Sequence, residues 1–120
     1  MSDQSDLGKA GEAFAAEHLR KNDYIILKQN YVWKKAEVDI IAKKNNKVIF
    51  VEVKTRAAEF MNEAALMVPR SKQKQIIKAA DAFLKAENIE LNSRFDIISV
   101  VLNSKQKKLD HIEDAFYPTL

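Results

Sequence analysis

The chain contains no cysteine, and among its 120 residues there are only two prolines, two glycines and two histidines. Without cysteine there can be no disulfide framework and no thiolate metal site. His18 and His111 stand far apart in the sequence and do not form a short ligand pair of the HxxxH type. Any metal site must therefore use oxygen ligands, which favours Mg²⁺, Ca²⁺ or Mn²⁺.

Long apolar runs are also absent. No segment approaches the ~20 apolar residues that span a bilayer, and the first residues resemble no leader peptide. We therefore expect a cytoplasmic protein with no membrane partner. Its length and its 47% hydrophobic content predict one domain over residues 1–120. The net charge of +3 is small, but the cations form clusters, such as those at 70–78 and 105–108. Such clusters are typical either of a nucleic-acid-binding face or of a solvated lysine-rich surface.

Hydrophobic periodicity predicts an α/β fold in the order αβββαββ. A first helix follows Asp6 as N-cap and ends near residues 21–23, and a second runs from 70 or 71 to about 87. Strands are predicted over 24–30, 36–43, 47–54, 94–102 and 108–112, with a loop over 55–69. Asn45 and Asn46 predict a tight hairpin turn, because asparagine tolerates a positive φ.

This hairpin carries the strongest functional signal. Centring the turn on residues 45–46 places Asp39 opposite Glu52 and Glu37 opposite Lys54, with Cβ atoms of facing residues roughly 4.5–5.5 Å apart. Because strand side chains alternate, all four polar groups share one face. The other face is then continuous core, formed by Val38, Ile40, Ala42, Ile49, Val51 and Val53.

Two carboxylates that face each other between apolar strands repel, unless a counter-charge lies between them. A divalent cation held by Asp39 and Glu52 would resolve the conflict. It would also polarise a phosphodiester and acidify water. Lys54, on the same face, could position the attacking water or neutralise charge in the transition state. Glu12 could add a further carboxylate if its helix packs over the open end of the hairpin.

Each assignment has a simpler alternative. Asp39, Glu52 and Lys54 could form a surface ion-pair ladder, Glu37 could be an exposed strand residue, and Glu12 a solvated helix residue. The cations expected near the mouth of the site, in contact with substrate phosphates, are Arg56, Arg70, Lys72 and Lys74. For Lys74 the alternative is a solvated helix face.

Several motifs resemble known families. Asp39, followed at a distance by Glu52-Val53-Lys54, resembles the Asp…(Asp/Glu)-x-Lys signature of the PD-(D/E)XK nuclease superfamily. Further motifs together resemble the bacterial YraN-like family: Gly8-x-x-Gly11-Glu12, Glu37-Val-Asp39, Phe50-Val-Glu-Val-Lys-Thr-Arg56, Arg94-Phe95-Asp96 and His111-Ile-Glu-Asp-Ala-Phe116. The chain departs from the usual pattern in having Val38 instead of proline before Asp39, and Ala36 where glycine is frequent.

The resemblance implies a restriction-endonuclease-like fold, akin to archaeal Holliday-junction resolvases, with a mixed sheet flanked by helices. It implies a metal site formed by Glu12, Asp39 and Glu52, with the main-chain carbonyl of Val53 as a further ligand and Lys54 as the catalytic lysine. We therefore expect a Mg²⁺- or Mn²⁺-dependent endonuclease acting on DNA, with branched DNA as one candidate substrate. A non-catalytic nucleic-acid-binding module and a protein-interaction domain remain as alternatives. The oligomeric state is open, with a homodimer as one outcome.

Overall fold

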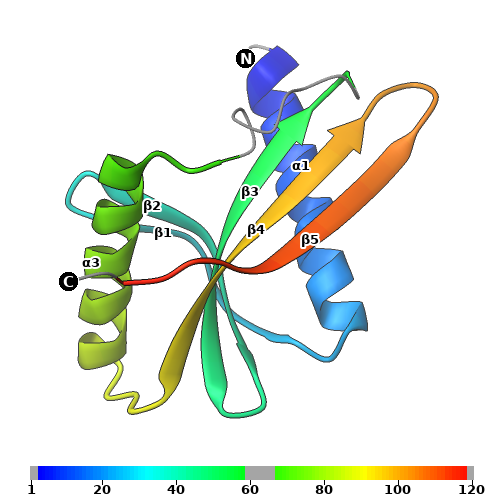
Figure 1. The fold of residues 1–120 in the computed structure, drawn as a ribbon. Helices are drawn as coiled ribbons and strands as arrows, with labels where there is room; N and C mark the ends of the chain where they lie inside the picture. Colours follow the sequence, from blue (N-terminus) through cyan, green and yellow to red (C-terminus); the bar gives the residue numbers. More distant parts are fainter. Residues whose placement is uncertain (1–2, 59–66, 119–120) are drawn as a thin grey trace.

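The computed structural model describes residues 3–58 and 67–118, and within them two helices flank a five-stranded mixed sheet (Figure 1). The predicted α/β class and the order αβββαββ are confirmed. The elements are α1 (Asp3–Lys21), β1 (Ile25–Trp33), β2 (Ala36–Lys44), β3 (Lys47–Arg56), α3 (Arg70–Ala86), β4 (Asn92–Leu102) and β5 (Lys107–Phe116). None of the helices described here is long and apolar enough to cross a bilayer.

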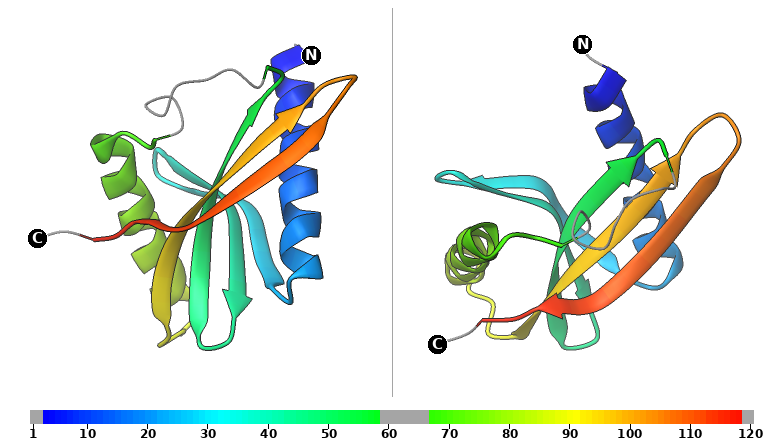
Figure 2. Two further views of the ribbon diagram at one scale, coloured as in Figure 1. Left: turned by 45° about the vertical axis from the view of Figure 1, so that its right-hand side comes forward. Right: turned by 45° about the horizontal axis from the view of Figure 1, so that its top comes forward.

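The strands are arranged in the order β1-β2-β3-β4-β5. β3 and β4 are parallel, whereas the other neighbouring strands are antiparallel. A parallel pair requires a crossover connection, and α3 lies within it. The two views of Figure 2 show α3 on one face of the sheet and α1 on the other.

Each face of the sheet therefore has its own apolar core. The α3 side is built around aromatic rings, with Phe50 stacked on Phe95 and in edge contact with Phe83. The α1 side is aliphatic and consists mainly of Ala15, Leu19, Ile40, Ile49, Val51 and Ile98. Because both faces are covered, the central strands are apolar almost throughout, and a buried charge on them stands out.

Some predicted boundaries are wrong. Asp6 is not an N-cap, because α1 already includes Asp3. Acidic residues are favourable in the first turn of a helix, because the helix dipole has its positive end there. β1 continues to Trp33 instead of ending near Asn30, and β5 continues to Phe116. The predicted loop loses residues 55–56 to β3, and residues 59–66 of it lie outside the described residues.

The predicted hairpin turn is confirmed, since Asn45 has a φ of 56° and Lys44 pairs with Lys47. The predicted register holds up to the pair Ile40–Val51, where the pairing of β2 with β3 ends. β3 instead pairs with β4 over its whole length. Figure 1 shows the result: the β1–β2 turn lies beside α3, away from the far ends of β3 and β4.

β2 separates from β3 at the point where its other neighbour, β1, is kinked. Asn30, with a φ of 53°, lies between the pairs Gln29–Ile40 and Tyr31–Val38, and so stands opposite Asp39. Val38 packs on the α3 side and Ile40 on the α1 side. The prediction that Val38 and Ile40 belong to one apolar face is therefore wrong. The kink interrupts the alternation of β2 side chains between the two faces of the sheet at Asp39.

α1 lies very close to β3 at Gly11. A Cβ added there would lie 1.9 Å from Thr55 Oγ1 and 2.8 Å from Thr55 Cβ. At Gly8, one turn earlier, such a Cβ has no described atom within 4 Å apart from its chain neighbours and the nearby backbone of α1 itself. The lack of a side chain at Gly11 therefore sets the distance between α1 and the sheet, and with it the position of the next residue, Glu12.

This difference predicts opposite effects for two alanine substitutions. Gly11→Ala should push α1 away from Thr55 and lower the free energy of unfolding by about 1–3 kcal/mol. Gly8→Ala should raise it by up to ~1 kcal/mol, because alanine favours a helix and has room there. Urea denaturation of both variants checks the prediction. Equal stability of the two variants would contradict the close contact.

Candidate functional site

Carboxylates line a hollow where β2 and β3 separate. Glu37, Asp39 and Glu52 contribute to a cavity of about 370 Å³, which is completed by Lys35 and Ala36 and by four α3 residues, Ser71, Lys72, Gln75 and Ile76. Asp39 and Glu52 are each only 8% exposed. The structure thus brings these two predicted site residues together in one hollow, which is called the carboxylate hollow below.

Asp39 ends the pairing of the two strands. The main-chain N–H of Val53 donates a hydrogen bond of 2.7 Å to Asp39 Oδ2, so a side chain takes the place of a main-chain acceptor in β2. This is why neither of the predicted facing pairs, Asp39–Glu52 and Glu37–Lys54, forms between the two strands, although Asp39 and Glu52 still line the same hollow. Burial first and the nearby charge of Glu52 second raise the pKa of Asp39 to about 8, although the hydrogen bond from Val53 acts in the opposite direction.

Glu52 has a counter-charge on one oxygen only. Lys72 Nζ lies 2.6 Å from Glu52 Oε1, while Glu52 Oε2 is buried and has no hydrogen-bond partner among the described residues. Burial lowers the pKa of Lys72, but the hydrogen bond to Glu52 and its charge outweigh burial and raise it. The ion pair therefore compensates only part of the cost of burying two carboxylates.

Glu12 and Lys54 lie near this pair. Glu12 is half-buried, and its pKa is raised by burial and then by the charges of Glu37 and Glu52. Lys54 follows Glu52 by two residues in a regular strand and therefore points to the same face, about 6.6 Å further along. Lys54 is half-buried and does not line the hollow itself.

The donor set suits a hard divalent cation. In the present side-chain positions, residues 3–58 and 67–118 contain no group of three or more His, Cys, Asp or Glu side chains that could hold a metal ion. Two buried carboxylates with one unsatisfied oxygen nevertheless match the oxygen ligands that Mg²⁺ and Mn²⁺ prefer. Glu12 would be the third carboxylate, and the Val53 carbonyl stays a predicted ligand.

The predicted phosphate-binding cations are not all on one side of α3. Lys72 points into the carboxylate hollow, whereas Arg70 and Lys74 line a different hollow with Tyr117 and Pro118. Residues two apart in a helix point in different directions, so these two cannot share the side of Lys72. On β3, Arg56 Nη1 donates a 2.6 Å hydrogen bond to Ser99 Oγ. Phosphate contacts by these residues stay a prediction.

Apart from Lys72, sequence reasoning missed the α3 residues that face the site. Ser71, Gln75 and Lys78 are spaced by four and three residues, which places them on one side of a helix. Ser71 and Gln75 line the carboxylate hollow, as does Lys35 from the turn between β1 and β2. The helical spacing was a usable signal for Ser71 and Gln75, whereas Lys35 depends on how the hairpin folds toward α3.

The motif Arg94-Phe95-Asp96 and His111 belong to a separate cluster. Asp96 is fully buried and accepts hydrogen bonds from Arg94 Nε at 2.9 Å and the Asp114 N–H at 3.0 Å, with His111 Nε2 at 2.7 Å. Burial raises the pKa of Asp96, but the His111 and Arg94 contacts outweigh it, and the pKa is lowered. None of these residues lines the carboxylate hollow. Because Asp96 belongs to β4 and His111 and Asp114 belong to β5, the cluster holds these two strands together.

Comparison with known proteins identifies the family. The model of the uncharacterised protein family UPF0102 matches residues 11–100. The chain is 43% identical over 118 residues to a UPF0102 protein of Christiangramia forsetii, with 98% of each chain covered. It is 41% identical over 117 residues to a UPF0102 protein of Flavobacterium psychrophilum, again with 98% of each covered. With a UPF0102 protein of Bacteroides thetaiotaomicron the identity is 40% over 122 residues, which covers 100% of this chain and 99% of that one. The chain therefore belongs to the UPF0102 family, the YraN-like family whose motifs its sequence resembles.

Proposed function

We propose that this chain is a Mg²⁺- or Mn²⁺-dependent endonuclease of the PD-(D/E)XK type that hydrolyses phosphodiester bonds in DNA, branched DNA included. The observation that supports it most is the pair Asp39 and Glu52, each 8% exposed in one hollow, with no described residue donating a hydrogen bond to Glu52 Oε2. An unsatisfied buried charge costs stability. A cation-binding role gives this arrangement a physical reason.

The proposal gives each of these residues a role. When bound, a divalent cation polarises the phosphodiester and acidifies water. Asp39 and Glu52 would hold it, with Glu12 and the Val53 carbonyl as further oxygen donors. Lys54 would neutralise charge that develops on the phosphate oxygens.

Other cations would bind the rest of the substrate. Lys72 would exchange its partner Glu52 for a substrate phosphate once the cation neutralises Glu52. Arg56, Arg70 and Lys74 would bind phosphates farther from the cleaved bond. Cleavage of both strands of branched DNA needs two such sites, which a homodimer would supply. A cytoplasmic location belongs to the same proposal.

A second function is favoured by one observation. The Lys72 ammonium, 2.6 Å from Glu52, already neutralises one carboxylate without any metal. A nucleic-acid-binding module that does not catalyse would suit such a site, since its cations could bind phosphates and its carboxylates would need no ion. The two functions differ in whether divalent metal changes the DNA.

A cleavage assay separates them. Labelled linear, forked and four-way DNA are incubated with Mg²⁺ or Mn²⁺ and, in parallel, with chelator. We expect cleavage by the wild type with metal only, and loss of at least about 100-fold in rate for Glu52→Gln. Glu90→Gln, at an exposed position outside the site, is the matched control and should cleave normally. DNA binding without cleavage by any of the proteins would favour the second function, and metal-independent cleavage would contradict the first.

A further inference from the structure

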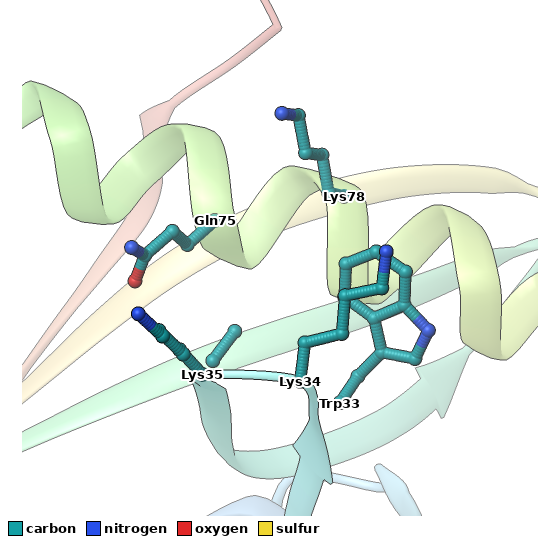
Figure 3. A pocket seen from close by; sticks show the side chains of 6 residues that line it. Trp33, Lys34, Lys35, Gln75 and Lys78 are labelled. Atoms are coloured by element: carbon teal, nitrogen blue, oxygen red, sulfur yellow. The ribbon is translucent and has the colours of Figure 1, made fainter.

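A second hollow lies beside the carboxylate hollow. Its volume is about 290 Å³, and it is lined from the β1–β2 turn and α3 by Trp33, Lys34, Lys35, Ala36, Gln75 and Lys78 (Figure 3). Lys35, Ala36 and Gln75 line both hollows, so the two adjoin each other. Figure 3 shows Lys35 and Gln75 reaching toward each other from the turn and the helix. This second space is called the tryptophan hollow below.

The indole of Trp33 offers an accessible flat surface. Trp33 is half-buried and packs against the core on the α3 side. Lys34 Nζ lies 4.6 Å from the centroid of the Trp33 ring, and Lys34 itself is exposed. A flexible, exposed lysine that lies over the ring can be displaced at little cost. A flat group can therefore reach the face of the indole.

The described residues that line this surface carry charge of one sign. Three of these six residues are lysines, and none of the six is a carboxylate. Lys34 also has a φ of 55°, a backbone conformation that glycine or asparagine adopts more easily. Cations around an aromatic surface are complementary to a flat ring that carries an anionic group, which is the chemistry of a nucleotide.

We propose that the tryptophan hollow binds an unpaired nucleobase of the strand whose phosphates lie at the carboxylate hollow. The inference rests on the proposed function and deepens it by naming the substrate feature: an unpaired nucleotide next to the cleaved bond. The base stacks on Trp33, and Lys35 and Lys78 bind the flanking phosphates. A cavity of about 290 Å³ is at the lower limit of ligand pockets and takes a base rather than a duplex.

Another basic hollow with an aromatic residue provides a comparison. It is lined by Arg70, Gln73, Lys74, Ile77, Lys78, Tyr117 and Pro118, and Tyr117 is 65% exposed. Within the described part of the chain, this hollow shares no lining residue with the carboxylate hollow. A base bound there would not be held next to the cleaved bond, so Tyr117 serves as the matched control for Trp33.

Intrinsic fluorescence tests the stacking directly, because Trp33 is the only tryptophan in the sequence. Short single-stranded DNA is titrated into the wild-type protein in chelator, next to a strand of equal length and charge made of abasic nucleotides. We expect the normal strand to quench Trp33 and to bind roughly 10- to 100-fold more tightly than the abasic strand. Equal binding and equal quenching by both strands would overturn the proposal.

Variants locate the effect. By anisotropy of a labelled strand, Trp33→Leu should weaken binding roughly 10- to 100-fold and Tyr117→Leu by less than about twofold. Lys35→Gln, which leaves the core packing intact, should weaken binding and reduce the salt slope by about 0.7. It keeps the proposal testable if Trp33→Leu fails to fold. Equal binding by Trp33→Leu and Tyr117→Leu, or wild-type binding by Lys35→Gln, would overturn the proposal.

These measurements need neither metal nor cleavage, so the two proposals can fail separately. Quenching of Trp33 by unpaired bases, in a protein that cleaves no DNA under any metal condition, would contradict the nuclease function alone. Metal-dependent cleavage that is identical in wild type and Trp33→Leu, on forked as on blunt DNA, would contradict the tryptophan hollow alone.

Discussion

Replacing Lys54 by methionine should lower the rate of DNA cleavage about 100- to 1,000-fold, the usual cost of removing one preorganised group that stabilises charge in a transition state. Lys54 lies on the same face of β3 as Glu52, two residues further along, and is half-buried. Methionine retains most of its aliphatic stem and removes only the ammonium group. The change should therefore leave folding and cation binding intact, and single-turnover cleavage at saturating protein measures the loss.

The control is Lys47→Met, at the exposed first residue of the same strand. It removes an equal charge from the opposite end of β3, away from the carboxylate hollow. This variant should cleave at close to the wild-type rate. If Lys54→Met and Lys47→Met slow cleavage equally, Lys54 contributes only to the overall positive charge. Its assignment as the catalytic lysine would then be wrong.

The second large effect is on the pH dependence of stability without metal. Asp39 titrates at about 8 in the folded protein, against an ordinary value of 3.8. Between these two values the folded chain retains a proton that the unfolded chain has lost. Raising the pH therefore favours the unfolded chain, and Asp39 should reduce the free energy of unfolding by at most about 1.4 kcal/mol per pH unit. The stabilising contribution is complete below about pH 4 and is lost as the pH rises through about 8.

The variant Asp39→Asn isolates this contribution. Asparagine can still accept the hydrogen bond from the Val53 N–H, but it neither titrates nor repels Glu52. Its stability in chelator should vary less with pH than that of the wild type, and Asp110→Asn, at an exposed position, should behave as wild type. His18 works in the opposite direction, because burial lowers its pKa and stability falls when it must be protonated. The comparison is therefore made between variants by urea denaturation at each pH.

Much of the fold could be predicted from the sequence, because its determinants are local. The asparagines at 45–46 fix the hairpin turn, and the apolar pattern of β2 and β3 fixes their register as far as Ile40 and Val51. Periodicity also gave the order of the elements. The missed strand extension past Asn30 has a local cause as well: a single residue with positive φ resembles the end of a strand but here only kinks it.

The candidate site was predictable only in part, because its shape depends on tertiary contacts. Strand alternation and the turn predicted that Asp39 and Glu52 share one patch. The same geometry wrongly continued the strand pairing to Asp39–Glu52 and Glu37–Lys54, since it could not show that the Asp39 carboxylate would bind the Val53 N–H.

The helix that completes the site was the least predictable part. The packing of α3 against the sheet places Lys72 next to Glu52. It places Arg70 and Lys74 in another hollow. A count of cations along the sequence cannot separate these positions, whereas helical spacing can. The tryptophan hollow depends on the fold of the β1–β2 turn against α3, which no local pattern in Trp33-Lys34-Lys35 reveals.

The central claim is that Asp39 and Glu52 bind a divalent cation, and the melting temperature at about pH 8.5, with Mn²⁺ and with chelator, tests it most directly. A cation that binds only the folded chain adds about 2.7 kcal/mol at a hundredfold excess over Kd, which should raise the wild-type melting temperature by several degrees. Asp39→Asn should melt above the wild type in chelator, because it lacks the repulsion with Glu52, and should gain little from Mn²⁺. An equal rise in both proteins, or no rise in the wild type, would contradict the claim.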